Sequence, residues 1–480
     1  MTASATLLIL GADGDLTKRL LLPGLGTLLA VDDMDLEVIG SGLQERSDAE
    51  WRELVAAAFD AVPEGRRARL LESTRYVRAD ATDAGELARL LSACTAVPIV
   101  FFALPPAVTA RVCLVLEHLE RPAGMRLALE KPFGTDRESA HRLNELLTRI
   151  VPERQVYRID HFLGRATVLN ILGTRFANRL IEPVWNRRTI ERVELVYDET
   201  LGLEGRAGYY DRAGALVDMV QSHLLAVLAL VAMEPIDRVD EVVLRDAVAD
   251  VLRETSVWGG DPVAASRRAR YVAGEIEGRA LPSYAHEPGV DPGRETETLA
   301  QVVVGVDTDR WRGVPFVLRS GKALGRSRKV ARAVFRAAAP IEGLEGRPRS
   351  DWIELDLSSG EVEIGLTMNG GGDPFALEQT TLIANQVPGA LLPYGEVLKG
   401  ILNDDPTLSV RGDVAEECWR IVDPVLAAWR EGRVPLEEYP AGSAGPSGWA
   451  GLPERRLDEP GERDRDRDRA SASALEHGAR

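Results

Sequence analysis

An apolar run that stops at a glycine turn opens the chain, and it limits what the N-terminal part can fold into. Residues 6–10 read TLLIL, and GADG follows at once at residues 11–14. Leu16, Leu20 and Leu25 then recur at a spacing typical of a helix. The order strand, glycine turn, helix predicts the first unit of a parallel α/β sheet, in which crossover helices join the strands.

The same turn suits a dinucleotide site. Gly11 and Gly14 would let the backbone approach a pyrophosphate, and the N-terminus of the following helix would supply free N–H donors. The G-x-x-G spacing is a weak signal by itself, because strand-to-helix turns often carry two glycines for conformational reasons alone. The turn therefore leaves both interpretations open.

The alternation of strands and helices continues through the first third of the chain. Strands are predicted at residues 36–40, 99–104 and 126–130, and helices at residues 83–94 and 136–150. This alternation indicates a Rossmann-like parallel sheet. In such a fold the end of the second strand, near residue 40, reads the adenosine ribose of a dinucleotide.

The pattern changes from residue 193 onward. Residues 193–197 alternate apolar and polar side chains, as a strand with one exposed face would, and similar runs lie at 299–306, 352–357 and 361–368. A helical spacing of apolar residues marks 214–233. The sequence therefore predicts a second, β+α domain with a large, mainly antiparallel sheet.

The length of the chain supports this division, because 480 residues exceed one ordinary hydrophobic core. We expect a dinucleotide-binding domain at residues 1–172, a β+α substrate and dimerisation domain at 173–450, and a tail at 451–480. The tail alternates acidic residues with arginine and has no apolar face, so we expect it to be disordered.

Composition excludes several classes of function. The formal net charge of −17 argues against nucleic acid or an anionic membrane as a partner. No uncharged apolar run approaches the roughly 18 residues of a membrane span, and the N-terminus lacks the features of a signal peptide, so we expect a cytoplasmic protein. Three scattered cysteines give neither a disulfide framework nor metal-ligand spacing, so we expect buried thiols and no metal.

The segment RIDHFLGR at residues 158–165 places one acid, one imidazole and two guanidinium groups around three apolar residues and a glycine. Ile159 and Leu163 can be buried while Asp160 and His161 project from neighbouring positions. The composition suits an anion-binding site. It also suits a salt-bridged helix start, and the residues alone do not decide between the two.

Five separated motifs resemble those of the glucose-6-phosphate dehydrogenase family, in the same order along the chain. They are GADGDLTKR (11–19), EKPFG (130–134), RIDHFLGR (158–165), QSHLL (221–225) and LRSGK (318–322). The resemblance extends over about residues 7–449. It implies oxidation of glucose 6-phosphate, or a closely related hexose 6-phosphate, at C1 to the lactone with NADP or NAD. It also implies a homodimer or homotetramer assembled through the large sheet.

The resemblance assigns roles to individual residues. His223 matches the family's catalytic base, and Asp160 would orient the imidazole and stabilise its protonated form. The sugar phosphate would contact His161, Arg165, Glu204, Asp218, Lys322 and Lys131. The coenzyme would contact Gly11, Gly14, Asp15, Leu16, Leu43, Pro105 and, between nicotinamide and sugar, Lys131.

Two of these assignments have alternatives that involve no function. A lone helical histidine such as His223 is commonly structural, and a lysine at a strand end such as Lys131 is commonly solvated. Asp218 and His223 lie five residues apart, about 1.4 turns of an α-helix, so they are expected to project at different angles, although both could border one pocket.

Three departures from the family pattern bear on specificity. Leu43 stands where the family commonly has the arginine that pairs with the 2′-phosphate of NADP, with Glu45 close by and Arg46 one helical turn away. A carboxylate there would accept from a free ribose hydroxyl and repel a phosphate, so we expect NAD to be used at least comparably with NADP. Arg165 and Leu20 stand where the family has lysine, which indicates an altered sugar or coenzyme preference.

Two alternatives to glucose-6-phosphate oxidation remain at this point. One is a dehydrogenase for a different anionic or modified hexose. The other is a weakly active paralogue that binds its ligands as a regulatory subunit.

Overall fold

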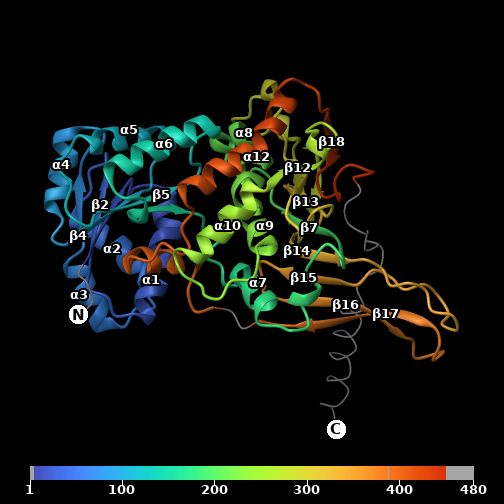
Figure 1. Cartoon of the computed structure of the whole chain (residues 1–480). Coiled ribbons are helices and arrows are strands. Elements are labelled where there is room, and N and C mark those ends of the chain that lie inside the picture. The colour runs from blue at the N-terminus through green and yellow to red at the C-terminus, as the bar shows by residue number, and fades with distance from the viewer. Residues whose placement is uncertain (1–4, 387–388, 450–480) are drawn as a thin grey trace, which may run out of the picture. The chain divides into compact units, whose positions relative to one another are not determined.

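The structure, a computed structural model, describes residues 5–386 and 389–449 (Figure 1). The tail predicted at 451–480 lies outside the described residues. Described residues up to Gly445 form one compact unit, and the boundary expected between residues 172 and 173 stays a prediction.

The N-terminal part contains a parallel sheet, and over the described residues this sheet has six strands in the order β3-β2-β1-β4-β5-β6. The strands are β1 (Ala5–Leu10), β2 (Leu36–Gly42), β3 (Arg75–Arg78), β4 (Val97–Phe102), β5 (Arg126–Glu130) and β6 (Val156–Ile159). This is the strand order of a doubly wound dinucleotide-binding fold. The prediction of a Rossmann-like domain is confirmed.

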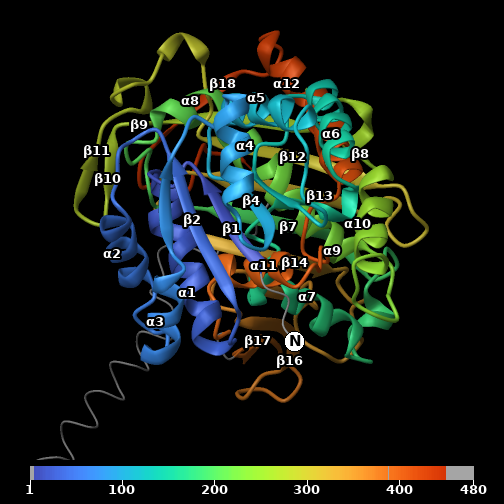
Figure 2. The same cartoon turned by 90° about the vertical axis from the view of Figure 1, so that its left-hand side faces the viewer.

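Helices cover both faces of this sheet, which explains why its central strands are apolar at almost every position. One apolar core gathers α1 (Leu22–Val31), α2 (Asp48–Ala58) and α3 (Glu64–Glu72) on one face. Another gathers α4 (Ala84–Ala93), α5 (Pro106–Glu117) and α6 (Arg137–Ile150) on the other. Figure 2 shows the two groups of helices on opposite sides of β1, β2 and β4.

The second sheet is large and mainly antiparallel, as predicted, and has ten strands over the described residues. In spatial order they are β17 (Leu377–Ala384), β16 (Val362–Asn369), β15 (Trp352–Asp356), β14 (Arg328–Phe335), β7 (Ile190–Asp198), β13 (Pro315–Gly321), β12 (Leu299–Val306), β9 (Ser266–Val272) and β18 (Leu436–Pro440), with β8 (Thr255–Val257) paired to β12. The pairs β7–β13 and β9–β18 are parallel. A separate hairpin joins β10 (Gly274–Ile276) and β11 (Arg279–Leu281).

The expectation that residues 193–197 form a strand with one exposed face is wrong. Both Glu194 and Val196 on β7 are buried, as are Val193 and Leu195. The strand lies between β13 and β14 in the middle of the sheet, and Glu194 accepts a hydrogen bond from Arg192 at 2.7 Å. The alternation of apolar and polar residues in this strand therefore reflects the pairing of buried Glu194 with Arg192. It does not mark a solvent-exposed face.

The main helices of the second part are α7 (Ala166–Phe176), α8 (Ala207–Ala215), α9 (Leu225–Ala232), α10 (Val243–Arg253) and α12 (Gly412–Arg430). Much of their apolar surface joins that of the sheet in one core. The helical stretch Ala207–Ala232 is long and apolar enough to cross a membrane, but 78% of its most apolar window is buried inside the protein. That burial is typical of a core helix.

Two helical segments depart from α-helical geometry. Residues Thr17–Leu21 (η1) and Leu216–Leu224 (η4) are π-helical, with hydrogen bonds between residues five apart. The first continues directly into α1, and the second joins α8 to α9. The helix expected at 214–233 therefore exists, but the turns in its first half are wider than those of the predicted α-helix.

Helix α11 (Pro393–Leu402) returns to the N-terminal part of the chain. Tyr394, Val397, Leu398 and Ile401 belong to the same core as α1. The approach is so close that a Cβ on Gly24 would lie 2.5 Å from the Cβ of Tyr394. The dinucleotide-binding part thus completes its core with residues from near the C-terminus.

The three cysteines are free thiols, and the expectation that they are buried is confirmed for two of them. Cys113 and Cys418 are buried and Cys94 is half-buried. Burial raises the pKa of Cys113 to about 12, so this thiol stays protonated and unreactive at neutral pH.

Candidate active site

Asp160 directly follows β6, at the carboxyl edge of the parallel sheet. The C-terminal end of this strand is buried, and the side chain of Asp160 is only 2% exposed. Its Oδ1 accepts a hydrogen bond from the backbone N–H of Phe162 at 2.9 Å and lies 2.6 Å from Nδ1 of His223. The first of these bonds fixes the carboxylate, and the second joins the two parts of the chain.

His223 lies on the π-helical segment η4 and is 1% exposed. Because a π-helix hydrogen-bonds residues five apart, Asp218 and His223 lie one turn apart on the same side. The expectation that they project at different angles assumed α-helical geometry and is wrong. The wider turn explains how one helix presents an acid and an imidazole together.

The imidazole of His223 is held by ring contacts as well as by Asp160. The ring of Phe162 stacks on it with centroids 4.0 Å apart and planes 16° apart. His161 meets it edge-on at 5.0 Å. Nδ1 faces Asp160, so with an N–H at that position Nε2 carries the lone pair that accepts a proton.

The electrostatics of this pair favour a neutral histidine. Burial lowers the pKa of His223 below its ordinary 6.5, and Asp160, which acts to raise it, only partly offsets the effect. Burial acts to raise the pKa of Asp160, but its interaction with His223, through the charge that this ring carries when protonated and through the hydrogen bond, together with the charge of Lys131, outweighs burial and holds that pKa below its ordinary value. At neutral pH the pair is an ionised carboxylate beside a neutral imidazole, which is the state a general base requires.

His161 and Arg165 come from the same short segment. Burial lowers the pKa of His161 to about 3, so it stays neutral. Its ring stacks on Tyr394 with centroids 6.0 Å apart. Arg165 precedes α7, and its guanidinium lies 5.0 Å from the centre of the Phe162 ring.

Two further residues of the segment explain its composition. A Cβ on Gly164 would lie 2.5 Å from the carbonyl oxygen of Pro393, so glycine permits the close approach of α11. Arg158 is fully buried and pairs with Glu153 at 2.7 Å. Arg158 therefore forms a structural salt bridge, which was one of the two interpretations of this segment, whereas Asp160 and His161 lie close to His223.

Lys131 and Lys322 bring positive charge to the same region. Lys131 donates to the backbone oxygen of Asp218 at 2.6 Å and lies 3.4 Å from its Oδ1. Lys322 pairs with Glu199 at 2.7 Å. Burial acts to raise the pKa of Asp218, but Lys131 and Lys322 together hold it below its ordinary value.

Glu204 is placed differently from the others. It has a positive φ of 49°, its side chain is 42% exposed, and its Oε1 pairs with Arg279 of β11 at 2.6 Å. The proximity of Lys322 contributes to lowering its pKa, after the larger effect of Arg279. Its carboxylate is thus engaged by Arg279.

The glycine turn fits a dinucleotide. Gly11 has a φ of +84°, and a Cβ there would lie 2.3 Å from the carbonyl oxygen of Ala103, so no side chain could occupy this position. The turn borders a cavity of about 300 Å³ whose lining also includes Gly14, Leu43 and Pro105. Asp15 and Leu16 follow at the start of the helix.

Of the residues that follow β2, Leu43 lines this cavity. Leu43 is 68% exposed. Glu45 is 87% exposed and lies 3.6 Å from Arg78. Arg46, in contrast, lies 3.2 Å from Asp13 of the glycine turn. Leu20, on η1, is half-exposed and supplies no charge.

Sequence reasoning missed several residues of the site. Tyr394 donates a hydrogen bond to Glu130 at 2.9 Å, and burial raises the pKa of Glu130 to about 7. No motif drew attention to Tyr394, because it lies 264 residues from Glu130 in the chain. Asp13 could have been found, since it is an acid inside a turn that otherwise approaches phosphate.

The described residues contain one group with metal-ligand potential. Ligand atoms of Asp160, His161 and His223 all lie within 4.8 Å of one another. The 2.6 Å separation between Asp160 and His223 is that of a direct hydrogen bond. The arrangement therefore suits proton transfer, and we interpret it as an acid–imidazole pair.

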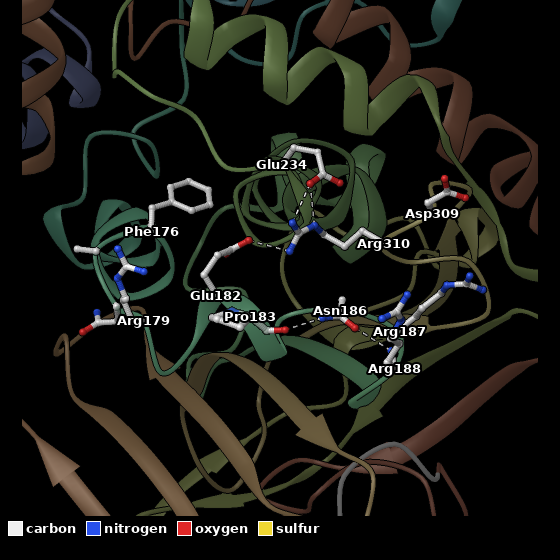
Figure 3. A pocket seen from close by; sticks show the side chains of 12 residues that line it. Phe176, Arg179, Glu182, Pro183, Asn186, Arg187, Arg188, Glu234, Asp309 and Arg310 are labelled. Atoms are coloured by element: carbon white, nitrogen blue, oxygen red, sulfur yellow. Dashed lines mark hydrogen bonds and ion pairs between the residues drawn. The ribbon is translucent and has the colours of Figure 1, made fainter.

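A separate cavity of about 1000 Å³ contains none of the predicted site residues (Figure 3). Arg310 pairs there with Glu182 at 2.8 Å and with Glu234 at 2.8 Å. Its charged lining is mixed in sign: Arg179, Arg187, Arg188, Arg310, Glu182, Glu234 and Asp309. This mixture gives it no clear preference for an anion.

Family models match both parts of the chain. The model described as "Glucose-6-phosphate dehydrogenase, NAD binding domain" matches residues 8–170, and "Glucose-6-phosphate dehydrogenase, C-terminal domain" matches residues 172–458. Glucose-6-phosphate 1-dehydrogenase of Treponema pallidum (strain Nichols) is 37% identical, covering 92% of each chain. That of Gluconobacter oxydans (strain 621H) is 36% identical, covering 91% of this chain and 94% of the relative.

Solved structures agree with these matches. Glucose-6-phosphate 1-dehydrogenase from Mycobacterium avium is 30% identical with a TM-score of 0.80, covering 95% of this chain and all of that one. A glucose-6-phosphate dehydrogenase in complex with its substrate glucose-6-phosphate has a TM-score of 0.83 at 26% identity, covering 93% of this chain and 97% of that one. With its parallel NAD-binding sheet, its large second sheet and its buried acid–imidazole pair, the chain belongs to the glucose-6-phosphate dehydrogenase family.

Proposed function

We propose that the protein oxidises glucose 6-phosphate at C1 to 6-phosphoglucono-lactone, with NAD or NADP as hydride acceptor. The observation that carries this proposal is the buried pair in which Nδ1 of His223 lies 2.6 Å from Asp160. Oxidation of a hemiacetal carbon needs a base for the hydroxyl proton, and a neutral imidazole backed by a carboxylate is such a base. The names and coverage of the relatives support the choice of sugar.

In the proposed reaction Nε2 of His223 takes the proton from the C1 hydroxyl while the C1–H bond breaks and C1 forms a double bond to oxygen. The bound coenzyme supplies the acceptor for the hydride. Asp160 orients the imidazole through Nδ1 and stabilises the charge that His223 acquires. Burial of both side chains strengthens this interaction by excluding water.

The remaining predicted residues would bind the sugar phosphate. Arg165 and Lys322 supply positive charge for the 6-phosphate, and a neutral His161 could donate one hydrogen bond to it. Asp218 would accept from sugar hydroxyls, and Lys131 would hold it in place. Glu204 would accept from a sugar hydroxyl through its carboxylate, whose Oε1 is already paired with Arg279.

Gly11, Gly14, Asp15, Leu16, Pro105 and Lys131 would hold the coenzyme. The close approach of Gly11 to Ala103 supports this assignment, because it leaves room for a pyrophosphate where a side chain would otherwise be. The adenosine end supports use of NAD. Leu43 brings no charge to a 2′-phosphate, so Leu43→Arg should move the kcat/KM ratio towards NADP.

The sheet edge supports an oligomer. Strand β17 ends the large sheet, and Leu382 and Ile383 on it are exposed, as is Met368 on β16. An exposed apolar edge strand is a common site of association between copies. We therefore include a homodimer or homotetramer, assembled through this sheet, in the proposal.

Initial rates across a panel of hexose phosphates, each with both coenzymes, test the proposed function. Glucose 6-phosphate should give the highest kcat/KM, and His223→Asn should abolish NAD(P)H production. A different anionic hexose that ranks far above glucose 6-phosphate would identify a specialised dehydrogenase instead. An absence of turnover with every sugar would favour a regulatory paralogue.

A further inference from the structure

We infer that Asp13, and not Glu45, is the carboxylate that reads the adenosine ribose and disfavours a 2′-phosphate. The inference rests on the proposed coenzyme-dependent function and adds to it the residue that determines coenzyme choice. Asp13 lies within the glycine turn, two residues after Gly11 and one before Gly14.

The side chain of Asp13 reaches the end of β2. A Cβ on Gly42 would lie only 2.3 Å from Oδ2 of Asp13, so the carboxylate packs directly on the last residue of that strand. Asp13, Gly42 and Leu43 all line the cavity of about 300 Å³ beside the glycine turn. In doubly wound folds the end of the second strand is where an acidic residue binds the ribose hydroxyls.

Two neighbours hold the carboxylate in place. Arg46 donates to Oδ1 at 3.2 Å, and the hydroxyl of Tyr76 donates to Oδ2 at 2.7 Å. A carboxylate oxygen has more than one acceptor position. Asp13 therefore keeps capacity for a ribose hydroxyl while its orientation is fixed.

The same contacts oppose a 2′-phosphate. A phosphate monoester carries a charge of about −1.5 to −2 at neutral pH, and it would face the negative charge of Asp13. Arg46, which lies 3.2 Å from Asp13, is already engaged by it. A 2′-phosphate bound by Arg46 would compete with Asp13 for this guanidinium, whereas a hydroxyl leaves the ion pair intact.

Glu45 lacks these properties. Its side chain is 87% exposed, and its partner Arg78 is 62% exposed at a distance of 3.6 Å. Arg78 also donates to the backbone oxygen of Leu43 at 3.0 Å. An exposed ion pair is screened by water and salt, so it discriminates weakly between ligands.

Binding of adenosine fragments to the full-length protein tests the inference without any sugar turnover. Isothermal titration would measure Kd for 5′-AMP and for adenosine 2′,5′-bisphosphate, which differ only in the 2′-phosphate. The wild-type protein should bind 5′-AMP at least as tightly. Tighter binding of the bisphosphate by about tenfold or more would overturn the inference, whatever the variants do.

Asp13→Asn should shift the ratio of the two Kd values towards the bisphosphate by about tenfold or more, the scale of one removed charge close to a phosphate. Glu45→Gln, which removes a charge of the same sign, should shift it by less than about threefold. A larger shift in Glu45→Gln than in Asp13→Asn would assign the role to Glu45 and overturn the inference.

Tyr76→Phe is the matched control for geometry, because it removes one support of Asp13 and keeps the charge. This variant should retain the wild-type preference. A shift as large as that of Asp13→Asn would mean that turn geometry, and not charge, controls the preference, and would also overturn the inference. If these ratios behave as expected but glucose 6-phosphate is not oxidised, the proposed function fails and the inference on Asp13 stands.

Discussion

At the scale of single residues, the proposed chemistry depends on one hydrogen bond between side chains 63 positions apart, Asp160 and His223. The carboxylate sets the imidazole tautomer, because Nδ1 must carry the proton for Nε2 to act as a base. A substitution that removes the charge of Asp160 but keeps the shape of its side chain distinguishes this effect on the tautomer from a purely structural role.

Asp160→Asn should lower kcat by about 10²- to 10⁴-fold and change KM for the sugar much less. An amide can donate to Nδ1 and so favours the wrong tautomer, while the substrate contacts remain. Steady-state kinetics would measure both constants, and circular dichroism would check the fold. A large rise in KM at unchanged kcat would mean that Asp160 binds the sugar instead.

The pH profile should show the lowered pKa of His223. The base is available when His223 is neutral, so activity is kept above its pKa and lost as pH falls through it. Because burial lowers that pKa below 6.5, the acid limb of kcat/KM should lie below 6.5. A limb above 6.5 with His223 intact would contradict this picture.

The same pKa shift affects stability. The folded-state pKa of His223 lies below its ordinary value, so the unfolded chain binds more protons between the two values. Its contribution to stability is therefore present above 6.5 and is lost as pH falls through the folded pKa. Thermal unfolding of wild type and His223→Asn at several pH values would measure this contribution.

At the scale of elements, the π-helical segment η4 carries both His223 and Asp218. Its start depends on Gly214, which has a φ of +65° and packs on the buried carboxylate of Glu297. Oε1 of Glu297 accepts a hydrogen bond from the backbone N–H of Leu216 at 3.0 Å. Gly214 and Glu297 together set where the helix that carries His223 begins.

Gly214→Ala should destabilise the protein by about 2–4 kcal/mol and lower kcat. A Cβ there would lie 2.2 Å from the Glu297 carboxylate, on a backbone that disfavours a side chain. Gly208→Ala on the same helix α8 is the matched control, because a Cβ there meets nothing within 4 Å. Thermal unfolding and kinetics should show the loss in the first variant alone.

The elements also show how far the sequence predicts the structure. The bounds of β5 and β12 were predicted to the residue, because buried apolar runs end where polar side chains begin. The widened turn at η4 was not predicted, because helical periodicity assumes one pitch throughout. Tyr394 was missed for a different reason, since its contact with His161 forms only when distant segments meet.

At the scale of the whole molecule, the large sheet ends in the exposed strand β17. Leu382→Asp should weaken association of copies through this edge, because it places a charge on an apolar contact surface. Light scattering across a dilution series should show a smaller species in the variant. An unchanged mass would exclude this edge as the interface. Leu201→Asp, an exposed apolar position away from β17, serves as a control.

Helix α11 has a consequence for the order in which the chain folds. The coenzyme-binding sheet comes first from the ribosome, but one of its two cores stays open until Tyr394, Val397, Leu398 and Ile401 have been made. Domains usually fold during synthesis from the N-terminus onward. Here the sheet that is synthesised first cannot complete this core until α11, one of the last helices, has been made. A chain truncated before α11 therefore exposes apolar core residues to chaperones and proteases.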